Sequence, residues 1–274
     1  MTGDDLGGIT MYVEKDCKRG YNEYISADVN NGENSYMDVA LLIMEEGDTF
    51  EFHEEEKEMA WIMFCGNATV EFDGQTVDME RPNPFDYSTW CLHLAAGGSC
   101  KLTAHGHSEF YVQKTYNDKK FENHLYTPDE TDTWRRGADG ECAGCIKRDV
   151  RTSFDYEINP QSNMVLGEVI NLPGKWSSYP PHSHPQPEVY FYHFERPDVG
   201  FGASWCDGEV VEIHHNGMSI ITEGVHPVVM APGMACCYAW GIRHLPDNPW
   251  EKTRIDDPAY VYLYDKNAEF WRGE

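Results

Sequence analysis

The sequence lacks a long apolar run, and this absence excludes a helical membrane span. Hydrophobic residues make up 41% of the 274 positions, yet no run approaches the ~18 consecutive apolar residues that such a span needs. The N-terminus, MTGDDLGGIT, carries acidic residues where a secretory signal would carry lysines. We therefore expect a cytoplasmic protein with no membrane partner.

Basic residues are also scarce. Lys and Arg total 21 against 47 Asp and Glu, which gives a formal net charge of −26. Such a surface repels phosphate backbones, which proteins bind with clustered Lys and Arg. Nucleic acid is therefore not an expected partner. A small anionic substrate is still compatible with this charge, because a few buried cations can set the potential of a pocket.

The cysteines do not indicate a disulfide framework. There are nine of them, an odd number without a secretory signal, which favours a reduced compartment. Cys142 and Cys145 form a single C-x-x-C, but a zinc ribbon needs a second pair. Cys236 and Cys237 are adjacent, so a strand would place them on opposite faces. Neither pair is expected to form a ligand set.

Amphipathic helices are scarce too, and short segments rich in aromatic and β-branched residues recur along the chain. Gly, Pro, Asn and Asp separate them, which is typical of an antiparallel β protein. The predicted strands include Ala60–Cys65, Ala68–Phe72, Glu109–Lys114, Val165–Asn171, Val189–Phe194, Val210–His214, Met218–Thr222 and Tyr260–Tyr264. Two β-rich halves flank a polar stretch with several glycines. We therefore predict an all-β chain with two antiparallel barrel domains in tandem, 1–145 and 146–274.

One group of polar residues in the second half suits a metal ion. His182 and His184 are two residues apart, so on a strand their side chains point to the same face. Glu188 shares their parity, although two intervening prolines suggest a bend. His226 stands at the entrance of another apolar strand, where a turn can aim its ring inward. Surface histidines beside a proline-rich turn are the simpler alternative.

Three imidazoles and one carboxylate suit Zn²⁺, Mn²⁺, Fe²⁺ or Ni²⁺. We therefore predict a single divalent transition metal held by His182, His184, Glu188 and His226. Coordination positions left open to water or substrate would make such a site catalytic. In the first half, His53, Glu58 and His93 are the nearest equivalents, but they lack the paired histidines, so we expect that barrel to be metal-free.

These residues carry a family resemblance. His182-x-His184-xxx-Glu188 resembles the first motif of the cupin superfamily, and Gly217…Gly224-Val225-His226 resembles the second. More narrowly, NLPGKWSSYPPHSH, YFYHFERPDVGFG and HPVVMAPG resemble the 5-deoxy-glucuronate isomerase family of myo-inositol catabolism. The resemblance extends more weakly over most of the chain and implies a bicupin with its metal in the C-terminal barrel. The short spacing before Glu188 and the segment EVYFY also resemble the 4-deoxy-5-threo-hexosulose-uronate ketol-isomerases of pectin breakdown.

The resemblance implies an aldose–ketose isomerase that converts 5-deoxy-glucuronate to 2-deoxy-5-keto-gluconate, with Zn²⁺ or Mn²⁺ favoured. Glu188 and Tyr190 are candidates for the catalytic base. Lys175 and Arg243 are candidates for binding the substrate carboxylate, because both lie near motif residues. Further side chains that would line the same cavity are Tyr179, Tyr192 and His244.

Two other functions fit the same ligands. An iron dioxygenase would use them to bind O₂ beside its substrate, and a non-catalytic cupin would bind a sugar acid without turnover. We also expect a homo-oligomer, since barrels of this kind often pair their edge strands.

Overall fold

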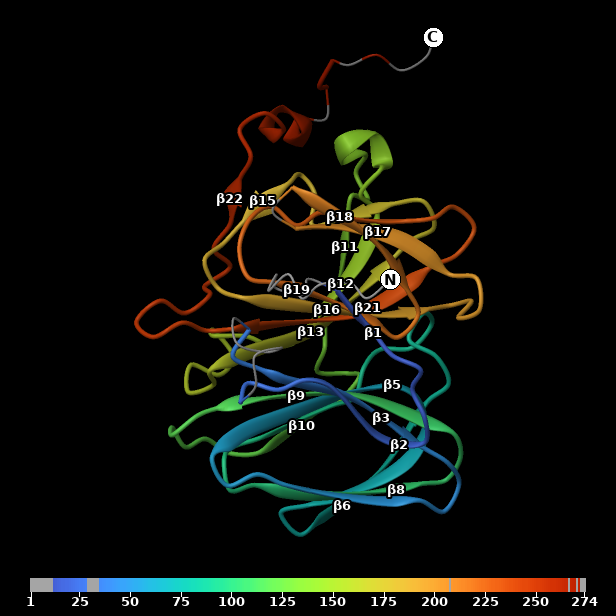
Figure 1. Cartoon of the computed structure of the whole chain (residues 1–274), viewed down its shortest axis with the longest axis vertical. Coiled ribbons are helices and arrows are strands. Elements are labelled where there is room, and N and C mark those ends of the chain that lie inside the picture. Colours follow the sequence, from blue (N-terminus) through green and yellow to red (C-terminus); the bar gives the residue numbers. More distant parts are fainter. Residues whose placement is uncertain (1–11, 29–34, 207, 266, 270, 272–274) are drawn as a thin grey trace, which may run out of the picture.

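The computed structural model describes residues 12–28, 35–206, 208–265, 267–269 and 271. They form two β lobes stacked along the long axis of the molecule (Figure 1). Within these residues the helices are two 3-10 turns, η2 (Glu141–Gly144) and η3 (Val261–Tyr264). None of the helices described has the length and apolar character needed to cross a membrane.

Among the described residues, the first lobe contains nine strands in one antiparallel network. They are β2 (Gly20–Ile25), β3 (Asp38–Met44), β4 (Thr49–His53), β5 (Lys57–Phe72), β6 (Gln75–Arg81), β7 (Cys91–Leu94), β8 (Ser99–Ala104), β9 (Ser108–Tyr116) and β10 (His124–Tyr126). Strand β5 pairs with β7 and β9 along its first part and with β6 and β8 along its last part. It therefore carries the chain from one layer of the lobe to the other.

A glycine allows this passage. Gly66 has a φ of 129°, and a Cβ at this position would lie 2.2 Å from the Ser108 hydroxyl. Only glycine avoids both the backbone strain and this collision. The predicted strands Ala60–Cys65 and Ala68–Phe72 are consequently two parts of one 16-residue strand.

The described part of the second lobe contains thirteen strands. They are β1 (Tyr12–Glu14), β11 (Thr133–Arg136), β12 (Arg148–Phe154), β13 (Met164–Asn171), β14 (Trp176–Ser177), β15 (His182–Ser183), β16 (Glu188–Phe194), β17 (Phe201–Cys206), β18 (Glu209–His214), β19 (Gly217–Ile221), β20 (Val228–Met230), β21 (Cys236–Arg243) and β22 (Ile255–Asp256). Seven strands form one sheet in the order β1-β19-β16-β21-β13-β12-β11, and β14-β20-β17-β18 form another. Strands β1 and β11, from the first 145 residues, therefore hydrogen-bond in the sheet of the second lobe.

Side-chain parity divides the apolar residues of the described strands among three large cores. On β16, Val189 and Phe191 face the other lobe, whereas Tyr190, Tyr192 and Phe194 face the interior of their own lobe. Strand β3 is buried on both faces for the same reason, with alternate residues in the inter-lobe core and in the core of the first lobe. The all-β, antiparallel prediction is confirmed, as is the placement of Cys236 and Cys237 on opposite faces.

One predicted strand is wrong. Residues 260–264 form the turn η3 and its N-cap, Tyr260; the tyrosines of this segment are exposed, and Leu263 packs on Cys142 and Ile146. A short aromatic run carries no periodicity that separates a strand from a 3-10 turn.

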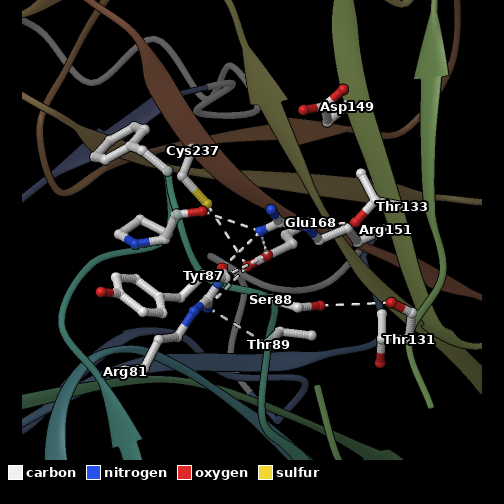
Figure 2. A network of polar contacts seen from close by, with 12 residues as sticks. Arg81, Tyr87, Ser88, Thr89, Thr131, Thr133, Asp149, Arg151, Glu168 and Cys237 are labelled. Carbon is white, nitrogen blue, oxygen red and sulfur yellow. Dashed lines mark hydrogen bonds and ion pairs between the residues drawn. The ribbon is translucent and has the colours of Figure 1, made fainter. Parts of the chain in front are cut away.

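A buried ion cluster joins the two lobes. Glu168 on β13 receives hydrogen bonds from Arg81 of the first lobe, at 2.5 and 3.0 Å, and from Arg151 on β12, at 2.7 Å (Figure 2). Arg81 and Glu168 have fully buried side chains. The thiol of Cys237 lies 3.7 Å from the same carboxylate. The lobes are therefore held together by charge as well as by apolar contact.

Candidate metal centre

The four residues of the predicted metal set lie together inside the second lobe. His182 belongs to β15, His184 follows it, Glu188 opens β16, and His226 precedes β20. Ring centroids are 4.7 Å apart for His182 and His226 and 5.0 Å apart for His184 and His226. One nitrogen from each of the three rings lies within 4.8 Å of the other two, and all four side chains are buried. The chain thus brings these residues to one point from three segments.

Backbone carbonyls fix which nitrogen each ring turns toward that point. The Nδ1 of His184 donates to the carbonyl of Gln186 at 2.9 Å, and that of His226 donates to the carbonyl of Gly224 at 3.0 Å. The Nδ1 of His182 lies 3.2 Å from the carbonyl of Ser178. A carbonyl can only accept, so each Nδ1 carries the proton and each Nε2 presents a lone pair, as in metal-bound histidines.

Those lone pairs face a carboxylate. The Oε2 atom of Glu188 lies 3.2 Å from Nε2 of His184 and 3.4 Å from Nε2 of His226. The His226 Nε2 is buried and lacks the alignment of a hydrogen bond. Burial also lowers the pKa of His226, and of His182 still further, so protonated rings are disfavoured. Acceptor atoms that face one another in a buried site need a cation between them, so the donor set fits a metal ion.

The metal set opens into a cavity of about 740 Å³. Its wall includes His182, His184 and Glu188, the phenols Tyr190 and Tyr238, and several apolar side chains from β12, β13 and β21. Such a volume suits a small organic ligand. The cavity, and not the four ligands alone, therefore defines the candidate functional site.

Tyr190 connects the metal set to the cavity wall. Its hydroxyl donates to Oε2 of Glu188 at 3.1 Å and lies 2.7 Å from the Ser178 hydroxyl. Burial, followed by the charge of Glu188, raises the pKa of Tyr190 well above its usual value. Tyr190 is therefore a neutral phenol at physiological pH. It can donate a proton, but it is not present as a phenolate before the reaction.

The cavity contains cations that the sequence analysis did not identify. Arg136, Arg148, Lys252 and Arg254 line it, whereas Lys175 and Arg243 do not. Arg243 instead points to backbone carbonyls at the end of β21, among them that of Asn163 at 3.2 Å. The sequence signal that could have identified Arg148 is the alternation of side chains along β12, because Arg148, Val150 and Thr152 all face the cavity.

Arg148 is the unusual member of this group. It is 5% exposed, and its guanidinium donates to the backbone carbonyl of Ile146 at 2.9 Å. Among the described residues no carboxylate forms an ion pair with it, while Arg254 pairs with Asp256. A buried charge without a counter-ion costs several kcal/mol, by order of magnitude. The site is therefore prepared for an anionic group that enters from solution.

The remaining side chains expected in the cavity lie outside its wall. Tyr192 shares a hydrogen bond with Ser219, and Tyr179 packs against Trp176 and Tyr260. His244 accepts a hydrogen bond from the backbone N–H of Trp250 at 2.9 Å and is buried. These three are packing residues in the second lobe.

His244 should contribute to acid sensitivity. Burial, with a smaller effect of Arg243, lowers its pKa to about 4 from 6.5. Below pH 6.5 the unfolded chain binds a proton that the folded chain does not bind, so the free energy of unfolding falls as the pH drops toward 4. At pH 5 this loss is at most roughly 2 kcal/mol. Urea unfolding of wild type and His244→Gln at pH 7 and pH 5 should show a smaller pH-dependent loss in the variant; equal losses would contradict this assignment.

The first lobe arranges its own candidates differently. His93 and Glu58 form a buried pair at 3.0 Å, and the same carboxylate accepts hydrogen bonds from Ser162 and Asn163 of the second lobe. His53 is exposed and pairs with Glu55. In the part of the chain that the structure describes, neither of the two groups of possible metal ligands includes His53, Glu58 or His93.

Comparisons with known proteins agree on one family. The model of the KduI/IolB family matches residues 11–263. A protein of Geobacillus thermodenitrificans named 5-deoxy-glucuronate isomerase is 30% identical over 149 residues, which span 46% of this chain and 52% of that protein. A protein of the same name from Geobacillus kaustophilus is 24% identical over 246 residues, 78% of this chain and 85% of that one. The match to the Geobacillus thermodenitrificans protein, which has the higher identity, thus spans about half of the length of that protein.

Solved structures agree with the fold. An IolB-like protein from Salmonella typhimurium aligns with a TM-score of 0.82 at 18% identity, covering 93% of this chain and 99% of that one. A cupin 2 conserved barrel domain protein from Leptotrichia buccalis aligns with a TM-score of 0.50 at 10% identity, covering 86% and 97%. At these identities the alignments show the fold alone, which is cupin-like.

Proposed function

The chain belongs to the KduI/IolB family and is an isomerase of that family, and from this premise we propose that it is a metal-dependent aldose–ketose isomerase of a sugar acid. The proposed reaction converts 5-deoxy-glucuronate to 2-deoxy-5-keto-gluconate. One observation carries the proposal: His182, His184 and Glu188 of the metal set line the same cavity as Arg148, a buried cation that has no acidic partner among the described residues. A metal site next to a carboxylate-binding group is what such a substrate requires.

The reaction moves hydrogen between neighbouring carbons. A base removes the proton from the carbon that bears the hydroxyl group, an enediol forms, and a proton returns to the former carbonyl carbon. The hydroxyl proton moves to the former carbonyl oxygen, so atoms balance without an oxidant. A divalent cation held by His182, His184, Glu188 and His226 would supply Lewis acidity that stabilises the negative charge developing on the enediol oxygens.

Glu188 and Tyr190 are the proposed proton carriers. The carboxylate of Glu188 can take up the proton, since it borders the cavity. The Tyr190 hydroxyl, 3.1 Å from Oε2 of Glu188, can supply a proton to substrate oxygen and be reprotonated from the Ser178 side. Because its pKa is raised, Tyr190 holds its proton until charge develops on that oxygen.

Arg148 is the proposed receptor of the substrate carboxylate. A guanidinium binds a carboxylate through two parallel hydrogen bonds, which fixes orientation as well as position. The burial of Arg148 makes this interaction stronger than it would be at the surface. The carboxylate end of the sugar acid would lie toward β12, and its carbonyl end toward the metal set.

An assay with two substrates tests the proposal. Purified protein loaded with Zn²⁺ or Mn²⁺ is incubated anaerobically in D₂O with 5-deoxy-glucuronate or with 4-deoxy-5-threo-hexosulose-uronate, and products are followed by NMR. We expect ketose formation from 5-deoxy-glucuronate, with solvent deuterium at the carbon that receives the proton. Turnover of the second sugar alone would identify a ketol-isomerase of pectin-derived uronates. Oxygen consumption with Fe²⁺, or binding without product, would overturn the isomerase assignment.

Replacing Arg148 with glutamine should raise KM for the sugar acid by ~10- to 150-fold, the loss of one charged hydrogen-bonded contact of about 1.5–3 kcal/mol. Arg148→Lys should recover part of this loss. Arg135→Gln is the matched control, because Arg135 lies on the neighbouring strand, pairs with Asp149 and is not in the cavity wall. Steady-state kinetics of all three variants provide the measurement. An unchanged KM in Arg148→Gln would assign the carboxylate to another residue.

A further inference from the structure

A second group of metal-type ligands lies where the two lobes meet, on the opposite side of β16 from the cavity. We propose that Cys65, Glu109 and His193 bind a second divalent transition metal, with zinc as the expected ion. One donor atom from each residue lies within 4.8 Å of the other two. The group mixes sulfur, oxygen and nitrogen and contains none of the first set of ligands.

A β-bulge brings two of these residues onto the inter-lobe face. Strands β5 and β9 pair regularly up to Met63 and Phe110, then skip one residue, so that Cys65 stands opposite Glu109. Directly paired residues of an antiparallel ladder share a face, with Cβ atoms about 4.5–5.5 Å apart. The extra residue, Phe64, joins the inter-lobe core. Bulges commonly re-aim side chains in this way.

The third residue comes from the other lobe. His193 on β16 has the parity of Val189 and Phe191, so it faces the first lobe while Glu188 faces the cavity. Its Nε2 lies 3.2 Å from Oε2 of Glu109, and its ring centroid is 4.9 Å from that of Phe64. The Nδ1 atom is buried and has no hydrogen-bond partner in the part of the chain that the structure describes. An imidazole with an unsatisfied nitrogen at a junction between lobes is costly unless a ligand is bound there.

Neighbouring side chains hold the group in place. Oε1 of Glu109 lies 3.0 Å from Nε2 of His107, whose other nitrogen lies 2.9 Å from Glu45. The ring of His215 lies 4.7 Å from that of His193 and accepts the backbone N–H of Phe194. Outer contacts of this kind orient metal ligands. Because His107 is half exposed, an ion can reach the group from solution, and water can complete its coordination.

The donor chemistry selects the ion. A thiolate, an imidazole and a carboxylate together suit Zn²⁺ and other late transition metals, whereas Ca²⁺ and Mg²⁺ prefer oxygen ligands alone. With ligands from both lobes, the bound ion would fasten one lobe to the other. Without an ion, the same contacts would reduce to an ion pair between Glu109 and two histidines, and this is the competing explanation.

Binding of Co²⁺ distinguishes a metal site from an ion pair, because of the two proposed metal sites only this one contains sulfur. Metal-free full-length protein with Cys145→Ser, which removes an exposed thiol, is titrated with Co²⁺. We expect two ions per chain and a sulfur-to-cobalt charge-transfer band in the near ultraviolet. Cys65→Ser should lose the band and one ion, and His193→Gln should weaken binding at this site. The double variant His182→Ala/His226→Ala should keep the band, so the two sites are scored separately.

Cys17→Ser is the matched control, since Cys17 lies in the same region but its thiol contacts the Tyr24 hydroxyl at 2.9 Å. The charge-transfer band of this variant should equal that of the Cys145→Ser protein. Should Cys65→Ser fail to fold, alkylation of Cys65 with and without Zn²⁺, read by peptide mass spectrometry, provides the answer. Protection by metal supports the site. Absence of the band, its persistence in Cys65→Ser, or equal alkylation with and without Zn²⁺ overturns it.

Discussion

Replacing His226 with alanine is expected to lower kcat by about 10³-fold or more, on the scale of losses seen when electrostatic stabilisation is removed from a catalytic site. The Nε2 of His226 is one of three imidazole lone pairs at the metal set. Two imidazoles and a carboxylate would bind a divalent cation far more weakly, so the variant should also lose one equivalent of metal.

The same substitution should leave the metal-free fold nearly unchanged. His226 is buried, but its Nε2 has no hydrogen-bond partner among the described residues, and such an atom costs about 1–3 kcal/mol. Its removal therefore offsets much of the cost of the cavity that alanine leaves. Zn²⁺ should raise the unfolding temperature of wild type more than that of the variant, because a ligand stabilises only the state that binds it.

Three measurements check this prediction: kcat for 5-deoxy-glucuronate, metal content by mass spectrometry, and thermal unfolding with and without Zn²⁺. His53→Ala is the control, since His53 is exposed and its ion pair is with the exposed Glu55. Full turnover by metal-free His226→Ala would exclude the proposed site.

Replacing Glu168 with alanine is expected to have the largest effect on stability, about 3–5 kcal/mol in the free energy of unfolding. The carboxylate receives hydrogen bonds from Arg81 and Arg151 (Figure 2). Without it, two buried guanidinium groups would lose their counter-charge between the lobes. Because Arg81 comes from the first lobe and Glu168 from the second, the contact between lobes should weaken first.

Urea unfolding followed by tryptophan fluorescence measures this effect. The control is Glu71→Gln, which breaks an exposed ion pair with Lys101 and should change stability by less than ~1 kcal/mol. A loss in Glu168→Ala as small as that of the control would mean that water or neighbouring groups neutralise the arginines. Separate transitions for the two lobes would locate the damage at their junction.

Much of the metal set follows from short-range rules. The spacing of His182 and His184 and the parity of Glu188 are local properties of a strand, and their proximity in the structure needs only the bend that the prolines suggested. His226 lies farther along the chain, but its neighbouring glycines and apolar strand indicated a turn toward the interior. The alternating orientation along β16 likewise followed from period two.

The rest depends on contacts between distant segments. Arg148 resembles any charged strand residue until β12 is placed beside the cavity, and nothing near it in the sequence says that it lacks an acidic partner. Lys175 and Arg243 were chosen for closeness in sequence, which does not determine closeness in space. Cys65 and His193 meet only because the lobes stack and a bulge shifts β5 by one residue.

The short strand β1 has a consequence for how the molecule is made. It pairs with β19 and lies at the margin of the seven-stranded sheet, so this segment must wait for a partner that is synthesised much later. Until then β1 has no partner strand. In a variant without β1, the outer edge of β19 would keep a row of unpaired amide and carbonyl groups, which is a template on which a foreign strand can add.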